Sequence, residues 1–128
     1  MIREFSGIIL FFVALVLAVV LLPIGLLSGI FLSNANSYLF MVSLSIDQLG
    51  NVVCRVLFDM TLIKHNKYYA FGNPDDTISY VIGRNKLINN LTTTGKILDD
   101  ILNFIDPGHT EMAVQRAIKI KKIRTAKK

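Results

Sequence analysis

The stretch from Phe71 to Lys86, FGNPDDTISYVIGRNK, contains the residues of this sequence that come closest to a chemical site. Two adjacent carboxylates, Asp75 and Asp76, could form a catalytic pair, and the glycine and asparagine before them could form a phosphate-binding loop. The carboxylates would repel a phosphate, however, and no histidine stands close by in the sequence to support catalysis. The same residues suit the start of a helix, with Asn73 as N-cap, a proline at the first helical position and Asp76 at the third. We therefore predict a helix over residues 74 to about 90 rather than a site.

A second candidate is the run from Thr92 to Lys96, TTTGK, which resembles the end of a phosphate-binding Walker loop. That loop requires a serine or threonine after the lysine and a glycine five positions before its last glycine. Ile97 and Asn90 occupy those two positions, so the match fails twice. A helix that begins after a threonine N-cap is the better interpretation.

His109 lies between Asp106 and Glu111, and these three side chains are of types that bind metal ions. The remaining ligand-type residues His65 and Cys54 have no spacing to His109 that a metal site would require. No serine or cysteine nucleophile can be paired with a histidine from the spacing either. We expect His109 to help begin the last helix, and we predict no catalytic residue, no metal ion and no cofactor.

Outside these motifs the sequence is dominated by apolar residues, which make up 52% of the 128 positions and give a mean hydropathy of +0.52. They concentrate between Gly7 and Leu32, where 26 consecutive residues carry no charge. About 20 apolar residues suffice to cross the hydrocarbon core of a bilayer, which is about 30 Å thick. Residues 1–32 are therefore predicted to be a transmembrane anchor. The alternative is a signal peptide with a weak cleavage site near Ala35, but the apolar part of such a peptide is only about 7–15 residues long.

The charges are distributed unevenly around this segment. Arg3 is the one basic residue before it, whereas twelve of the 14 Lys and Arg residues, with six acids, lie between Lys64 and Lys128. The positive-inside rule then places the C-terminal part in the cytoplasm. We predict a single-pass protein of the inner (cytoplasmic) membrane. The single cysteine, Cys54, excludes an internal disulfide.

Residues 38–63 form a second apolar segment with a different pattern. Apolar residues recur there in steps of three and four, at Leu39, Val42, Ile46, Leu49, Val53, Val56, Met60 and Ile63. This spacing is typical of an amphipathic helix. Polar residues fall away from that seam, and two of them, Asp47 and Arg55, each cost about 2.5–3.5 kcal/mol at the centre of a span. We predict one long amphipathic helix that lies on the membrane surface or packs against other helices.

Residues 64–128 are predicted to form a small region of short helices, because no strand-like alternation bounded by turns occurs in them. The predicted fold is therefore all-α, with a single N-terminal transmembrane helix, a long amphipathic helix and short helices. The region ends in a tail without acids after Glu111, whose basic residues are Arg116, Lys119, Lys121, Lys122, Arg124, Lys127 and Lys128. Beside a bilayer these residues are expected to bind anionic lipid. A purely topological role is one alternative, and non-specific nucleic-acid binding is a weaker one.

Small residues recur within the apolar anchor at steps of seven, four, seven and four, at Gly7, Ala14, Ala18, Gly25 and Gly29. These steps keep them near one face of a helix, where small side chains let two membrane helices approach closely. A kink at Pro23 would turn the two halves of this face apart. The stripe predicts helix–helix packing, in a homo-oligomer or in a larger membrane complex.

Several of these motifs together resemble a group of short phage and prophage proteins without an assigned activity. The resemblance rests on Asp47-Gln48 with Asn51, the run GNPDDTIS from Gly72 to Ser79, Gly83-Arg84, and Asp106-Pro107-Gly108-His109. The sequence departs from the pattern of that group at Asp76, Arg84, Thr110 and Ala113, where the group has Glu, Lys, Cys and Ser. The last two departures remove a thiol and a hydroxyl. The resemblance implies a phage origin and names no activity.

We therefore expect a non-enzymatic, phage-encoded membrane protein that acts at the host inner membrane in lysis, remodelling or host takeover. The lipid bilayer is its expected partner. The alternative function is that of an accessory subunit, which docks onto a larger membrane complex by its apolar seam.

Overall fold

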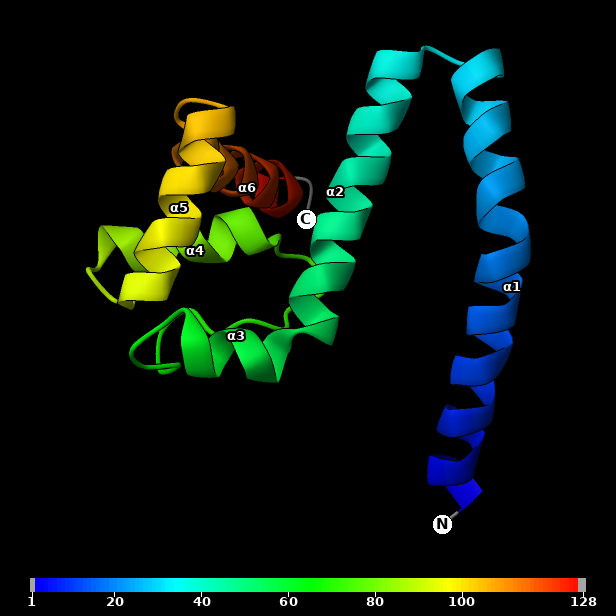
Figure 1. The fold of residues 1–128 in the computed structure, drawn as a ribbon, viewed down its shortest axis with the longest axis horizontal. Coiled ribbons are helices and arrows are strands. Elements are labelled where there is room, and N and C mark those ends of the chain that lie inside the picture. Colours follow the sequence, from blue (N-terminus) through cyan, green and yellow to red (C-terminus); the bar gives the residue numbers. More distant parts are fainter. Residues whose placement is uncertain (1, 127–128) are drawn as a thin grey trace. The chain divides into compact units, whose positions relative to one another are not determined.

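The computed structural model describes residues 2–126, and their side chains from Ser6 onward. The described chain is helical and contains no strand, which confirms the predicted all-α fold (Figure 1). Its helices are α1 (Ile2–Leu32), α2 (Ala35–Val53), α3 (Arg55–Thr61), α4 (Ile78–Leu87), α5 (Thr93–Ile105) and α6 (His109–Ala126). They divide into two compact units, Met1–Val42 and Ser43–Lys128, with the boundary inside α2.

Helix α1 is long and apolar enough to cross a membrane. Its apolar part, Ser6–Leu32, has 27 residues, and none of the most apolar 18-residue window is buried inside the protein. At 1.5 Å per residue this part is about 40 Å long, which exceeds the thickness of a hydrocarbon core. The single N-terminal membrane-span candidate predicted from the sequence is thus present.

In the first unit, the beginning of α2 folds back along the end of α1. The Tyr38 hydroxyl donates a hydrogen bond to the Gly25 carbonyl oxygen at 3.0 Å. The Tyr38 ring lies so close to Gly29 that a Cβ on that glycine would come within 2.1 Å of the ring. Gly29 is therefore needed for this contact, and only Ser33 and Asn34 separate the two helices.

The structure corrects the prediction of one continuous helix over residues 38–63. The chain bends by 75° between α2 and α3, at Cys54. Asn51 and Asp59 would lie about 12 Å apart on a straight helix. They nevertheless accept hydrogen bonds from neighbouring backbone N–H groups, those of Gly72 (3.0 Å) and Phe71 (2.9 Å). The bend brings both side chains to the same loop.

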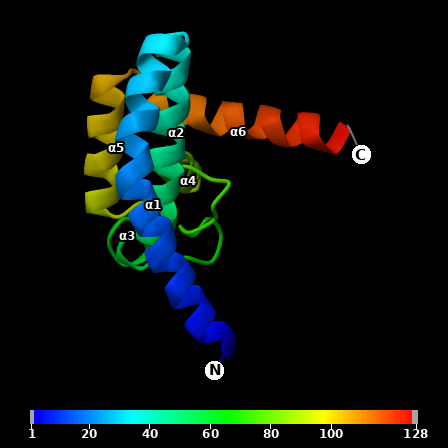
Figure 2. The same cartoon turned by 90° about the vertical axis from the view of Figure 1, so that its right-hand side faces the viewer.

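The second unit is built around α4, which packs against α5 and α6 (Figure 1). Figure 2 shows α6 extending well beyond the other helices of this unit. Gly83 of α4 permits the close approach of α6, since a Cβ there would lie 2.6 Å from the Thr110 carbonyl oxygen. The small apolar core consists of Leu62, Ile63, Phe71, Tyr80, Val81, Ile82, Leu91 and Val114.

Helix α4 begins four residues later than predicted, and its N-cap is Thr77 rather than Asn73. The Thr77 hydroxyl accepts a hydrogen bond from the Tyr80 N–H at 3.0 Å. Asn73 and Asp76 do bond each other, Nδ2 to Oδ2 at 2.8 Å, but within a turn before the helix. Asn51 holds the carbonyl oxygens of this turn and keeps them out of a helix. The threonine cap predicted for the next helix is confirmed, because Thr92 accepts a hydrogen bond from the Gly95 N–H at 3.1 Å.

Candidate functional site

Helices α2 and α3 turn their polar side chains into the second unit and their apolar side chains outward. We define the outer face of α2–α3 as Ile46, Leu49, Val53, Val56 and Met60, whose exposed fractions lie between 62% and 78%. Ile63, the last residue of the predicted seam, is buried in the core instead. The seam therefore predicted the apolar face correctly between residues 46 and 60. This face points away from the second unit, whereas the amphipathic helix of a globular protein usually packs its apolar side inward.

Asn51 is the centre of the inward, polar side and is fully buried. Its amide nitrogen donates to the carbonyl oxygens of Asn73 and Asp76, both at 2.8 Å. Its amide oxygen accepts the Gly72 N–H at 3.0 Å. Gly72 has a φ of +106°, which a glycine adopts without the strain that other residues would suffer. One side chain of α2 thus fixes the whole loop that leads into α4.

One turn before Asn51, Asp47 begins a chain of side-chain contacts that links three parts of the unit. Its carboxylate accepts the Ile78 N–H at 2.9 Å and the Ser79 hydroxyl at 3.2 Å. Ser79 Oγ lies 3.1 Å from His109 Nε2, and His109 Nδ1 lies 2.9 Å from Asp106 Oδ2. We call these four residues the Asp47–Asp106 relay. It joins α2, the first turn of α4 and the beginning of α6.

The relay contains a serine, a histidine and an aspartate in the order of a hydrolase triad, with Nε2 toward the serine and Nδ1 toward the aspartate. Two features oppose a nucleophilic role for Ser79. Ser79 is only 4% exposed, so the rest of the protein shields its Oγ from a substrate. The backbone N–H groups of Ile78 and Tyr80, which could otherwise stabilise an oxyanion, already donate to Asp47 and Thr77.

The contacts of the relay instead favour a clamp. Asp47 of α2 bonds Ser79 of α4, Ser79 bonds His109 at the start of α6, and His109 bonds Asp106 just before that helix. The clamp therefore holds α2, α4 and α6 together.

A second polar cluster lies at the other end of α4. Lys86 Nζ contacts Asp99 Oδ2 at 2.9 Å and Glu111 Oε1 at 2.6 Å. The hydrogen bonds with Asp99 and then Glu111 raise the pKa of Lys86 above its usual value. Hydrogen bonding to Lys86 is the main reason why the pKa of Glu111 lies below its usual value. The buried Thr110 hydroxyl also donates to Asp99, at 2.7 Å. The cluster joins α4, α5 and α6.

The basic residues predicted to bind lipid separate into different environments. Lys121 is turned toward the protein, where its Nζ lies 3.4 Å from Asp76 Oδ1 and 5.0 Å from the centre of the Tyr80 ring. Burial lowers the pKa of Lys121, but the attraction of Asp76 and Tyr80 outweighs it, so that this pKa is raised. Lys119 and Lys122 line an open pocket on the solvent side of α6. Arg116 and Arg124 are exposed elsewhere on that helix, and Lys127 and Lys128 lie outside the described residues.

The predicted stripe of small residues is also divided. A Cβ on Gly7 or Gly25 would meet nothing within 4 Å, whereas Gly29 is covered by Tyr38 of the same chain. Ala14 is exposed and Ala18 is half-buried. Helix–helix packing at Gly29 thus occurs within the chain, and self-association through the other four residues stays a prediction.

Sequence reasoning missed the relay, although Asp47, Ser79 and His109 all stand in the motifs that resemble the phage proteins. The spacing of Asp106 and His109, three residues apart, could have indicated their pairing. Nothing in the spacing of Asp47 and Ser79, which are 32 residues apart, indicated theirs. Over residues 2–126, no three His, Cys, Asp or Glu side chains gather as metal ligands would.

The chain matches no protein-family model, and comparisons with curated proteins and with solved structures also find no match. The phage resemblance therefore stays a prediction.

Proposed function

We propose that this chain is a small, non-enzymatic, phage-encoded protein that acts at the host inner membrane, in lysis, membrane remodelling or host takeover. In this proposal α1 anchors the chain as a single-pass span, and the outer face of α2–α3 lies in the membrane interface. The observation that carries the proposal is the arrangement of α2–α3. Large apolar side chains point outward there, while Asp47 and Asn51 form hydrogen bonds with other residues of the second unit.

Contact with water would be unfavourable for this outer face. Full burial of one large apolar side chain contributes about 1.5–3 kcal/mol, so the mostly exposed side chains of this face together represent roughly 5–10 kcal/mol. That is comparable to the whole stability of a small domain. Because only Ser33 and Asn34 separate α1 from α2, a membrane-inserted α1 would hold α2 at the bilayer. Lipid is the apolar phase within reach.

The proposed orientation, with the C-terminal part in the cytoplasm, rests on the charges. The basic residues lie almost entirely after α1, and cytoplasmic segments of membrane proteins carry the excess of Lys and Arg. A reporter that is active only in the cytoplasm, fused after Lys128, is expected to be active. A silent cytoplasmic reporter together with an active periplasmic one would reverse this orientation.

Membrane action is tested by inducing the full chain in bacteria and recording the membrane potential and growth. We expect the wild type to depolarise the membrane. The variant Val53→Ser/Val56→Ser, which makes two outer-face positions polar without touching the core, is expected to depolarise it much less. If both chains leave the potential and growth unchanged, the proposed action at the membrane is wrong.

A specific observation favours the alternative function, an accessory subunit of a larger membrane complex. Helix α5 also presents exposed apolar side chains, those of Ile97, Ile101, Phe104 and Ile105, on the side opposite its buried Gly95 and Asp99. Such a stripe fits a groove on a partner protein. Co-purification of a stoichiometric partner in mild detergent, lost in Ile101→Ser/Phe104→Ser, would support this function.

A further inference from the structure

The solvent side of α6 carries a pocket of about 390 Å³, lined by Gln115, Ile118, Lys119, Lys122 and Ile123. These residues recur at steps of three and four and therefore share one side of the helix. Val114, Thr110 and Lys121 lie on the other side, toward the core and Tyr80. The pocket thus combines two isoleucines with two lysines on the side of α6 that the protein leaves uncovered.

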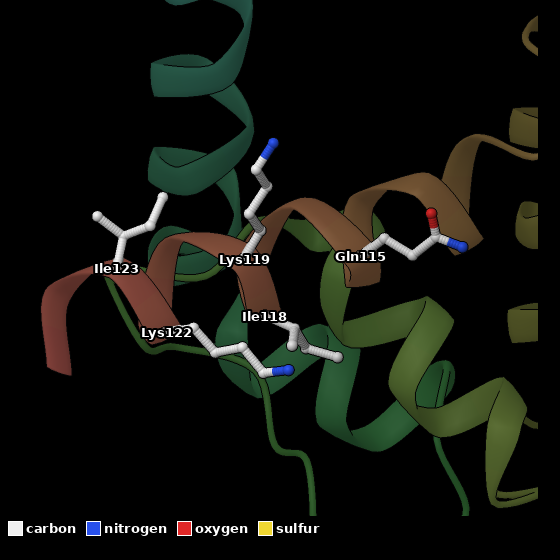
Figure 3. A pocket seen from close by; sticks show the side chains of 5 residues that line it. All are labelled: Gln115, Ile118, Lys119, Lys122 and Ile123. Atoms are coloured by element: carbon white, nitrogen blue, oxygen red, sulfur yellow. The ribbon is translucent and has the colours of Figure 1, made fainter. Parts of the chain in front are cut away.

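Lys119 and Lys122 have no hydrogen bond or ion pair with any residue in the described part of the chain, in contrast to Lys121, which contacts Asp76. Figure 3 shows the two lysine side chains extending from α6 in different directions. They form two basic edges, and Ile118 and Ile123 supply apolar surface at 38% and 48% exposure. Long lysine stems in such positions reach sideways to the polar headgroups while neighbouring apolar side chains enter the lipid.

We propose that this side of α6 binds the surface of a bilayer that contains anionic phospholipid. Lys119 and Lys122 each pair with a lipid phosphate, and Ile118 and Ile123 enter the headgroup layer. The inference rests on the proposed function only in that α1 holds the chain at a membrane. Of the seven basic residues that the sequence predicts to bind lipid, it selects Lys119 and Lys122. It leaves out Lys121, whose Nζ contacts Asp76 of the same chain.

The choice of a lipid surface over nucleic acid follows from the isoleucines. A nucleic-acid backbone offers phosphates but no apolar phase, so Ile118 and Ile123 would gain nothing from it. An anionic bilayer offers both, and each lysine near its surface strengthens binding about fivefold.

The test uses lysine labelling of the full chain in nanodiscs that contain either phosphatidylcholine alone or a mixture with phosphatidylglycerol. A neutral acylating reagent and mass spectrometry give the labelling rate of each lysine. We expect phosphatidylglycerol to lower the rates of Lys119 and Lys122 about fivefold. The internal controls are Lys121, which faces Asp76, and Lys96 of α5, and their rates are expected to change less than twofold.

Equal rates for Lys119 and Lys122 in both kinds of nanodisc would overturn the proposal. So would equal protection by inorganic phosphate, or stronger protection by a short oligonucleotide, in phosphatidylcholine discs. The variant Ile118→Ser/Ile123→Ser is expected to lose most of the protection by phosphatidylglycerol, and unchanged protection in this variant would exclude insertion of the isoleucines. A chain that fails to remain with the discs would contradict the proposed anchoring by α1, whereas a disc-bound chain with unprotected lysines contradicts this inference alone.

Discussion

Helix α1 and the bent pair α2–α3 are both rich in apolar residues, but they differ in what their polar side chains do. Between Ile8 and Leu32 of α1 most of the apolar side chains are exposed, and the hydroxyl of Ser28 bonds the Gly25 carbonyl of its own helix. In α2–α3 the buried Asn51 and the half-buried Asp47 and Asp59 bond the loop before α4. The comparison teaches that similar apolar content occurs both in a helix that could cross a membrane and in a bent pair of helices whose polar side chains bond the rest of the second unit.

The two units also differ in the interactions that stabilise them. The second unit has a small apolar core, and buried amide and carboxylate groups tie its loop and helices together. A buried polar group is costly once its partner is removed. The second unit is therefore expected to lose stability when a single buried polar side chain is replaced, whereas α1 is expected to tolerate the replacement of one of its polar side chains.

The largest effect is expected for Asn51→Leu, which removes three hydrogen bonds to the backbone at once. The Asn73 carbonyl oxygen keeps its bond from the Asp76 N–H, whereas the Gly72 N–H and the Asp76 carbonyl oxygen lose the bond to Asn51. At about 1 kcal/mol for each lost hydrogen bond, the second unit should lose about 3 kcal/mol. Urea unfolding in detergent, followed by circular dichroism, measures the change. The matched control is Ser28→Ala in α1, for which we expect less than about 0.5 kcal/mol. A comparable loss in both variants would remove the contrast between the two regions.

A smaller effect is expected at glycines, where the two regions again differ. Gly95→Ala would place a Cβ within 2.1 Å of the Leu62 carbonyl oxygen, and the resulting shift should cost about 1–3 kcal/mol of unfolding free energy. A Cβ at Gly25 would meet nothing within 4 Å, so Gly25→Ala should leave the stability unchanged and Gly25→Leu tests self-association of α1 without the direct clash of a Cβ that any substitution of Gly29 would have with Tyr38. Loss of a cross-linked oligomer in Gly25→Leu would support the predicted packing face, and an unchanged ladder would exclude Gly25 from it.

The Asp47–Asp106 relay is expected to contribute about 1–2 kcal/mol to the unfolding free energy of the second unit. Ser79→Ala removes the contacts to Asp47 and His109 and should destabilise the second unit by that amount. Thr125→Ala, which removes an exposed hydroxyl bonded to carbonyls of α6, should have almost no effect. A serine-reactive fluorophosphonate probe distinguishes a clamp from a nucleophile. We expect no labelling of Ser79, and stoichiometric labelling would show that the serine is reactive.

The smallest effect is expected for the loss of stability on acidification. The pKa of Glu111 is lowered in the folded chain, so its contribution to stability is present above the unfolded pKa and is lost as the pH falls through the folded one. The difference in stability between wild type and Glu111→Gln should therefore exist at pH 7 and disappear below about pH 4. Because the side chains of Lys86 and Glu111 are 39% and 45% exposed, we expect less than about 0.5 kcal/mol. A difference that grows on acidification would contradict this sign.

The sequence predicted what depends on local pattern. The run without charge revealed α1, the steps of three and four revealed the apolar side of α2–α3, and Thr92 revealed the start of α5. These features are visible in sequence because they repeat over neighbouring residues.

The sequence did not predict what depends on distant residues. The bend at Cys54 allows Asn51 and Asp59 both to accept hydrogen bonds from the loop at Phe71 and Gly72. The shift of the α4 cap to Thr77 has the same origin, since Asn51 holds the preceding turn. Contacts between residues twelve or more positions apart leave no local period, and the links of the relay from Asp47 to Ser79 and from Ser79 to His109 were missed for the same reason.

The central claim is that the outer face of α2–α3 lies in lipid, and electron paramagnetic resonance of spin labels tests it most directly. Single cysteines replace Leu49 or Val56 on that face, or the exposed Lys96 of α5 as control, in a Cys54→Ala background reconstituted in bilayers. Collisions with oxygen report lipid, and collisions with a water-soluble nickel complex report water. We expect labels at positions 49 and 56 to collide more with oxygen, and the label at 96 to collide more with nickel. Equal access of nickel to all three positions would contradict the claim.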